Sequence, residues 1–213
     1  MRLVRCRTVF LVLSVGVASA TAVVLASLAL AGEFGGGADD ISAFSSPPVS
    51  AERVPPAVVA AAGLLGGEPA DVPTELLPGN VDTTQARLLL SDVGKTHAQL
   101  FGIPTSKGGA CWIVSDGPAS CIQEFNDRTP IGFTIFDRDG LGGGDPVAVA
   151  GVTPDGVSGI EVVVGGQSNE AIVADNGFFY ELANSAAYPE AVTVIYADGA
   201  TRTIAIPKPV PIP

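Results

Sequence analysis

The chain has 213 residues, a formal net charge of −11 at pH 7 and a mean hydropathy of +0.42. This length allows one ordinary domain with extensions. Three of the eleven basic residues precede the first acidic residue, so the rest of the chain is still more anionic. Phosphate contacts require clustered lysine and arginine, and we therefore expect no binding to nucleic acid or to an anionic membrane surface.

The N-terminal stretch has the pattern of an export segment. Residues 1–7 carry three arginines, and residues 8–32 carry no charge. A signal peptide has an apolar core of about 7–15 residues, whereas a membrane-spanning helix needs about 20. The uncharged run is long enough to span, yet it ends in a small-x-small motif of the type that signal peptidase cuts. The sequence therefore predicts that residues 1–32 are a signal peptide cleaved after Ala31, or a membrane anchor that spans with residues 8–31.

Both interpretations predict the same location for the rest of the chain. Arginines at the N-terminal end keep that end in the cytoplasm. The residues beyond 33 are then extracytoplasmic, either secreted or anchored in the cytoplasmic membrane with the C-terminal domain outside.

The next stretches connect the export segment to a β-rich domain. Residues 33–54 are rich in glycine, serine, proline and acids without a sustained hydrophobic period, which predicts a flexible linker. Residues 55–65 predict a short helix with proline in its first turn and glycines after its end. We expect residues 55–85, this helix and a proline-rich loop, to pack on the domain. Residues 207–213 form a proline-rich tail.

Residues 86–206 alternate short β-branched and aromatic runs with Asp-Gly, Gly-Gly and Asn-Gly turns, as antiparallel strands do. A helix over residues 84–101 is the alternative for the first two strands, but Gly94 interrupts it. Many short strands without a long helix predict an all-β fold, an antiparallel Ig-like β-sandwich or a partly open barrel. The predicted strands lie near residues 86–90, 96–103, 110–115, 121–125, 131–136, 147–153, 158–164, 169–174, 177–182, 191–197 and 201–206.

Cys111 and Cys121 each lie five residues from Asp116, which is in the turn between two predicted strands. This hairpin would place Cys111 opposite Cys121, at a separation that suits a disulfide, and such a pair is oxidised outside the cytoplasm. The alternatives are a metal site and a catalytic thiol paired with His97. The spacing lacks the CxxC pattern of zinc sites, and a disulfide removes the thiolate, so we favour a structural disulfide.

Aspartates and glycines cluster after the predicted strand 131–136. Asp137, Asp139 and Asp145 supply the carboxylate oxygens that a hard cation such as Ca²⁺ requires, which makes this loop a weak candidate cation site. Leu141 stands where an EF-hand would place a third oxygen ligand. A hairpin loop without a bound ion is therefore the favoured interpretation, and we expect no cofactor and no dedicated metal site.

The motifs PTSKGGACW, VAGVTPDGVSGIEVVV, DNGFFYEL and YADG together resemble a group of uncharacterised secreted or membrane-anchored proteins of actinobacteria. The resemblance covers residues 55–206, and its most distinctive part is PDGV followed by DN-x-F-x-x-E-L. It implies a β-rich domain outside the cytoplasm. It implies no catalytic residues.

These patterns favour a non-enzymatic binding or envelope-associated module, with an envelope protein or glycan as partner. One alternative is the sensory outer domain of a single-pass membrane protein, although seven residues are too few for a cytoplasmic signalling domain. The other is a cell-wall hydrolase. The sequence contains neither G-x-S-x-G nor H-E-x-x-H, and a Ser-His-Asp triad would have to use His97, the single histidine. A hydrolase that uses a pair of carboxylates, as glycosidases do, stays an alternative.

Overall fold

The computed structural model describes residues 40–66, 81–115, 117, 119–137, 146–182 and 188–208. All of them belong to one compact unit, Gly35–Pro213. The predicted export segment, residues 1–32, lies outside the described residues. Within the described ranges, no helix combines the length and the apolar character that crossing a membrane requires.

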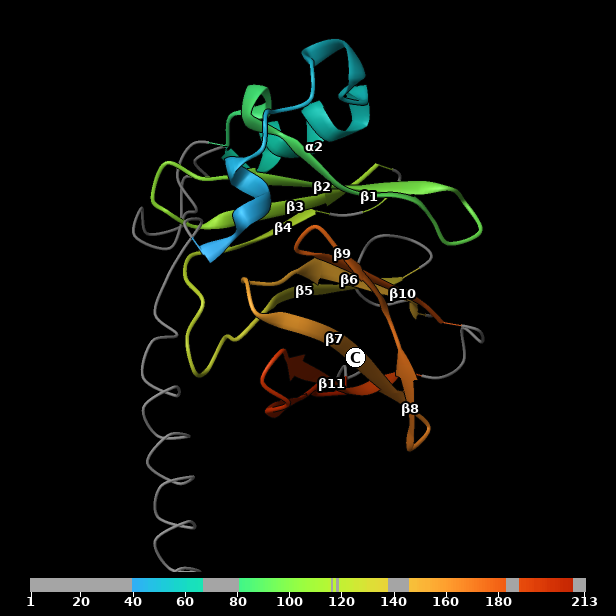
Figure 1. The fold of residues 1–213 in the computed structure, drawn as a ribbon. Helices are drawn as coiled ribbons and strands as arrows, with labels where there is room; N and C mark the ends of the chain where they lie inside the picture. The colour runs from blue at the N-terminus through green and yellow to red at the C-terminus, as the bar shows by residue number, and fades with distance from the viewer. Residues whose placement is uncertain are drawn as a thin grey trace, which may run out of the picture. The chain divides into compact units, whose positions relative to one another are not determined.

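The described strands form three antiparallel sheets of four strands each, which confirms the predicted all-β fold (Figure 1). Sheet I has the order β1 (Arg87–Val93), β2 (Ala98–Pro104), β3 (Ala110–Val114) and β4 (Ala119–Ile122). Sheet II has the order β5 (Gly132–Asp137), β6 (Pro146–Val152), β10 (Gly177–Glu181) and β9 (Ile172–Ala174). Sheet III has the order β12 (Thr201–Ala205), β11 (Pro189–Tyr196), β7 (Val157–Val164) and β8 (Gln167–Glu170).

Sheet II lies between the other two sheets and is buried on both faces (Figure 1). One apolar cluster joins sheets I and II and includes Trp112 and Phe179. A second cluster joins sheets II and III and includes Phe178 and Ile160. Phe178 and Phe179 enter opposite clusters because successive side chains of a strand point to opposite faces. The described sheets enclose two apolar clusters, and the finer prediction of an Ig-like sandwich or partly open barrel is not confirmed.

Close packing of sheets I and II depends on a glycine at the start of β10. A Cβ atom at Gly177 would lie 2.8 Å from the Cβ atom of Leu89 in β1. Real Cβ atoms essentially never approach other heavy atoms so closely, so a larger residue would push the two sheets apart. The glycine of the Asp-Asn-Gly turn thus serves the packing of the sheets as well as the turn.

Helix α2 (Pro56–Gly66) lies where the sequence predicts a short helix, and it covers the other face of sheet I. Val58 and Ala62, one turn apart, are buried against Phe101 and Ile113 in a third apolar cluster. Three short 3₁₀ helices complete the described helical structure: η2 (Ser42–Ser45), η3 (Ala51–Arg53) and η5 (Thr83–Gln85).

Residues 87–104 form a β-hairpin, so the strand prediction is confirmed and the helical alternative over 84–101 is wrong. Three residues at the end of β1 and in the connection to β2 have positive φ: Asp92, Gly94 and His97. A right-handed helix cannot continue through such residues.

The predicted strand 169–174 is divided between two sheets. Its first part belongs to β8 in sheet III, and its last part is β9 in sheet II. The chain changes sheets at Ala171, which is buried and donates its backbone N–H to the carbonyl of Ile160 at 2.8 Å. Because the pattern of β-propensity is continuous across this point, the sequence alone does not reveal the change.

Residues 40–54 differ from the flexible linker that their composition predicts. Ile41 is 1% exposed and packs in the cluster between sheets I and II, and Val54 is buried in the cluster beneath α2. Val49 donates its backbone N–H to the carbonyl of Ala86 at 2.9 Å. A few apolar residues at the right positions are sufficient to fix a polar segment on the sheets, so mean composition was a poor guide here.

Candidate functional site

Long-range polar contacts gather where residues 40–46 meet two turns of the β-domain. We call Asp155, Asn176 and Arg87, with the segment that they hold, the docking site. Asp155 lies in the turn between β6 and β7, and Asn176 lies in the turn between β9 and β10. Asp175 and Asn176 both have positive φ, as tight hairpin turns require of their central residues.

The two turns bind each other and the N-terminal segment. Asn176 donates its side-chain N–H to Asp155 at 2.8 Å and to the carbonyl of Thr153 at 3.2 Å. Asp155 accepts the backbone N–H of Ser42 at 3.0 Å, and Asn176 accepts that of Ala43 at 3.1 Å. Both accepted N–H groups come from the first turn of η2, where no helical partner exists for them. Asp155 and Asn176 therefore cap this short helix from distant parts of the chain.

The docked segment favours the ionised form of Asp155. Partial burial tends to raise the pKa of this carboxyl, but the hydrogen bonds donated by Ser42 and Asn176 outweigh it and leave the pKa below its ordinary value. A lowered folded-state pKa means that the contact stabilises the fold above the ordinary pKa of aspartate and weakens as the pH falls through the lowered value.

Arg87 holds the same segment from the start of β1. Its side chain is 8% exposed. The guanidinium donates to the carbonyls of Phe44 at 3.0 Å, of Ser46 and of Gln85. Burial lowers the pKa of Arg87 because the charged form loses hydration. Three carbonyls replace that water, so this arginine binds backbone and fixes the segment.

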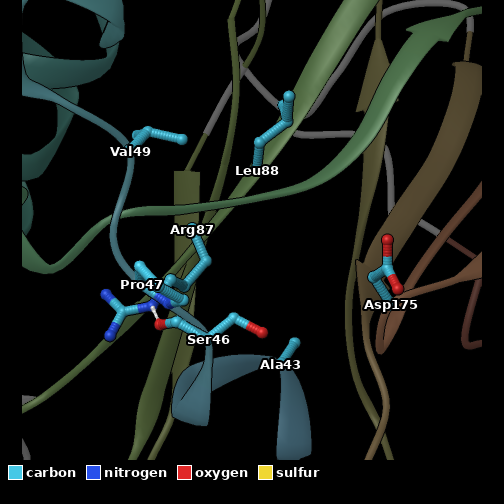
Figure 2. Close-up of a pocket in the computed structure, with 7 residues that line it drawn as sticks. All are labelled: Ala43, Ser46, Pro47, Val49, Arg87, Leu88 and Asp175. Carbon is cyan, nitrogen blue, oxygen red and sulfur yellow. Dashed lines mark hydrogen bonds between the residues drawn. The ribbon is translucent and has the colours of Figure 1, made fainter.

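A pocket of about 190 Å³ lies beneath the docked segment (Figure 2). Ligand sites for drug-sized molecules are larger, at about 300–1,000 Å³. Figure 2 shows the guanidinium of Arg87 directed toward Ser46 and away from Asp175. The two opposite charges therefore do not converge on a common ligand position. The residues that line the pocket are Ala43, Ser46, Pro47, Val49, Arg87, Leu88 and Asp175.

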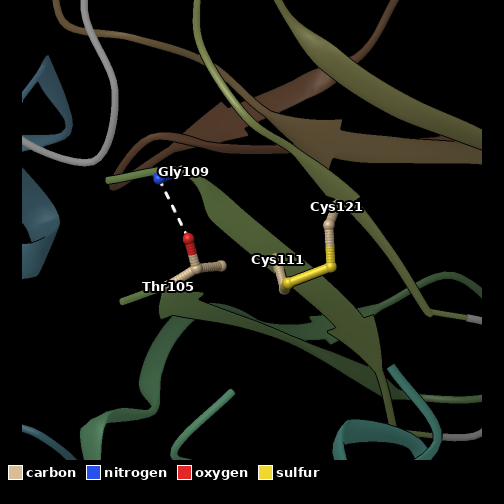
Figure 3. The surroundings of a disulfide bond; sticks show 4 residues. All are labelled: Thr105, Gly109, Cys111 and Cys121. Carbon is tan, nitrogen blue, oxygen red and sulfur yellow. Dashed lines mark hydrogen bonds between the residues drawn. A yellow bond between two sulfur atoms is a disulfide. The ribbon is translucent and has the colours of Figure 1, made fainter. Parts of the chain in front are cut away.

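The predicted disulfide is confirmed: Cys111 in β3 is bonded to Cys121 in β4, its direct partner in the register (Figure 3). Cys111 is fully buried. The turn before β3 is closed by a hydrogen bond from the Gly109 backbone N–H to the Thr105 hydroxyl, at 3.0 Å. The disulfide thus fixes the edge strand β4 to its neighbour β3 in sheet I. The face of sheet I opposite the disulfide packs against sheet II.

Replacing both cysteines with alanine should lower the free energy of unfolding by about 2.5–3 kcal/mol, the loop-closure entropy expected for a bridge over this separation. Urea unfolding of the oxidised protein and of the C111A/C121A variant measures the difference. Adding a reductant should lower the midpoint of the wild type and leave that of the variant unchanged. Equal stability of all these forms would contradict a stabilising role for the bridge.

The candidate cation site falls mostly outside the described residues. Asp139 and Asp145 lie outside the described residues, and Asp137 ends β5. His97, in the exposed turn between β1 and β2, contacts the carboxylate of Asp92. It lies far in the register from Cys111, and the sulfur of Cys111 is bonded to Cys121. Within the described residues, no group of three or more His, Cys, Asp or Glu residues is arranged to hold a metal ion.

The contacts of Asp155, Asn176 and Arg87 were not predicted from the sequence. Asp155 and Asn176 do lie in PDGV and DN-x-F-x-x-E-L, the motifs that are the most distinctive part of the resemblance. Their turn chemistry was visible in the sequence, but their meeting with residues 40–46 was not.

Comparisons of this chain with protein-family models, with curated proteins and with solved structures found no match.

Proposed function

We propose that this protein is an extracytoplasmic β-module that binds an envelope component, either secreted or held at the cytoplasmic membrane by residues 8–31. The proposal combines the arginine-rich and apolar N-terminal pattern with the docking site. It includes the resemblance to secreted and membrane-anchored actinobacterial proteins. In this proposal the module binds without catalysing a reaction, and the envelope partner is a protein or a glycan.

The observation that carries the proposal is the docking of residues 40–54 on the β-domain. Ile41 is buried in the core, and the turns of Asp155 and Asn176 hold the backbone beside it. The chain between the apolar run and Asp40 is therefore only residues 33–39. Seven residues extend to at most about 25 Å. An uncleaved anchor would keep the first docked residue within that length of chain from the membrane, which suits a module acting on neighbouring envelope molecules.

The side chains of the docking site are occupied by contacts within the chain. Asp155 and Asn176 are occupied by backbone N–H groups and by each other, and Arg87 is occupied by carbonyls. These groups stabilise the attachment of a segment. They are not directed at a shared position where a substrate atom would react.

The test is the intact mass and N-terminal sequence of the protein recovered from fractions of its own cells. A chain starting at Gly32 in the medium identifies a secreted module. A chain starting at Met1 in the membrane fraction, digested by protease added to spheroplasts, identifies a tethered one. A full-length chain in the cytosolic fraction, protected from protease until lysis, would overturn the proposal. A cytosolic marker enzyme in the same fractions controls for leakage.

A further inference from the structure

One face of sheet III is not covered by any described residue. In its central strands β7 and β11, the side chains of Ile160, Val162, Val192 and Val194 are fully buried against sheet II. The alternate residues point the other way, and we call the face that they form the outer face of sheet III. In Figure 1 no other described element lies beyond β7 and β11 on that side.

The residues of the outer face are half-buried or exposed, in contrast to the fully buried residues that point toward sheet II. Gly159, Glu161 and Val163 of β7 are half-buried, as expected for the middle of a sheet flanked by neighbouring strands. Val163 belongs to none of the three apolar clusters of the described residues. Their partners in β11 are likewise half-buried, and those in β12 and β8 are exposed.

The register gives the outer face its shape and charge. Its central row runs Thr203, Thr193, Glu161 and Glu170 across β12, β11, β7 and β8. The hydroxyls of Thr193 and Thr203 are hydrogen-bonded at 3.0 Å, which holds that end of the row flat. A neighbouring row contains Ala205 and Ala191. Side chains this small leave a smooth surface over which a partner can approach the sheet closely.

The other end of the central row carries two like charges. Glu161 and Glu170 are direct cross-strand partners, and like charges in this position destabilise a sheet. Glu161 also accepts a hydrogen bond from the Ser168 hydroxyl, which holds its carboxylate over the face. Among the described residues, no lysine or arginine is paired with either glutamate; Arg202, the basic residue of β12, donates to Asp127 at 3.0 Å.

We propose that the outer face of sheet III is the docking surface for a basic protein. Lysine or arginine side chains of this partner would lie against Glu161 and Glu170, and its backbone would lie over the threonines and alanines of the two rows. This inference deepens the proposed function, because it names the surface and the partner class of the same binding module. Such a partner would relieve the repulsion between the two glutamates on binding.

The charge of this face disfavours other occupants. A second copy would bring four like-charged carboxylates together. An anionic lipid or polymer would meet the same repulsion. A neutral glycan is usually held on aromatic rings, and the described residues of this face include no aromatic side chain.

The test uses the purified, ¹⁵N-labelled chain in the form recovered from cells, titrated with a deca-lysine peptide. We expect the amide shifts to concentrate in β7, β8 and β11. The E161Q/E170Q variant should bind the peptide about fivefold more weakly at low salt, as the loss of two exposed ion pairs implies. The E52Q/E124Q variant removes the same charge elsewhere and should bind within about twofold of the wild type.

Equal weakening by both variants would overturn the proposal, because the peptide would then be sensing the overall charge alone. Shifts spread over all acidic turns would overturn it too, as would concentration-dependent dimerisation through this face in sedimentation experiments. The result is independent of the location test: the purified chain binds or fails to bind the peptide wherever the cell keeps it. A cytosolic location together with specific binding would therefore reject the proposed function and keep the docking surface.

Discussion

Replacing Phe178 with alanine is expected to lower the free energy of unfolding by about 3–5 kcal/mol, the usual cost of deleting a buried aromatic side chain. Phe178 is fully buried in the cluster that joins sheets II and III. Its neighbour Phe179 is 7% exposed and lies in the other cluster, between sheets I and II. The F179A variant should therefore lose a comparable amount, because sheet II has two buried faces.

The two variants test whether β10 is buried on both faces, as in the three-sheet arrangement, or has one solvated face. In such a strand, only one of two adjacent residues faces a core. Urea unfolding measures both variants against Ile172→Ala, in the adjacent strand β9, where Ile172 is 54% exposed. Ile172 is the cross-strand partner of Phe179, so the control should lose at most about 1 kcal/mol. A large loss for F178A with none for F179A would contradict the double burial of β10.

Much of the secondary structure was predictable because it depends on local chemistry. Asp175-Asn176-Gly177 forms a tight turn, as these residue types indicate, and the positive φ values fall at Asp175 and Asn176. The position of Cys111 opposite Cys121 also followed from sequence, because two strands joined by a short turn have a single simple register. In both places, residues a few positions apart determine the geometry.

The order of the strands was not predictable, because it depends on contacts between distant residues. The strand β6 pairs with β10 and not with β7, which follows it directly, and β7 pairs with β11. Each of these strands carries a similar run of valine and isoleucine, so β-propensity alone does not select the partner. Burial of both Phe178 and Phe179 selects the middle layer for β10, and that requires the other two sheets to be in place.

The same reason explains why the docking site was missed. Asp155 and Asn176 lie in turns 21 residues apart in the sequence. The backbone that both bind, near Ser42, is more than 100 residues away from either. Turn residues of this type usually satisfy hydrogen bonds within their own turn. Only the packing of the sheets brings these two turns to the same end of the domain, where they cap η2.

Replacing Ile41 with alanine should lower the free energy of unfolding by about 2–4 kcal/mol, the usual cost of truncating a buried isoleucine. Ile41 is 1% exposed and contributes to the cluster between sheets I and II, so the substitution would leave a cavity beside β1 and β2. A flexible linker, which the composition of residues 33–54 predicts, would give no measurable change. The experiment therefore compares the two descriptions of this segment directly.

The matched control is Val59→Ala, at a position of α2 that is 46% exposed, where the loss should stay below about 0.5 kcal/mol. Amide hydrogen exchange provides a second measurement. The N–H groups of Ser42 and Ala43, which Asp155 and Asn176 accept, should exchange slowly in the wild type and rapidly in I41A if burial of Ile41 holds the segment in place. Rapid exchange in the wild type would mean that the attachment is transient. The length of chain between an export segment and the β-domain would then include residues 40–54, and the constraint on the position of the module at the membrane would be lost.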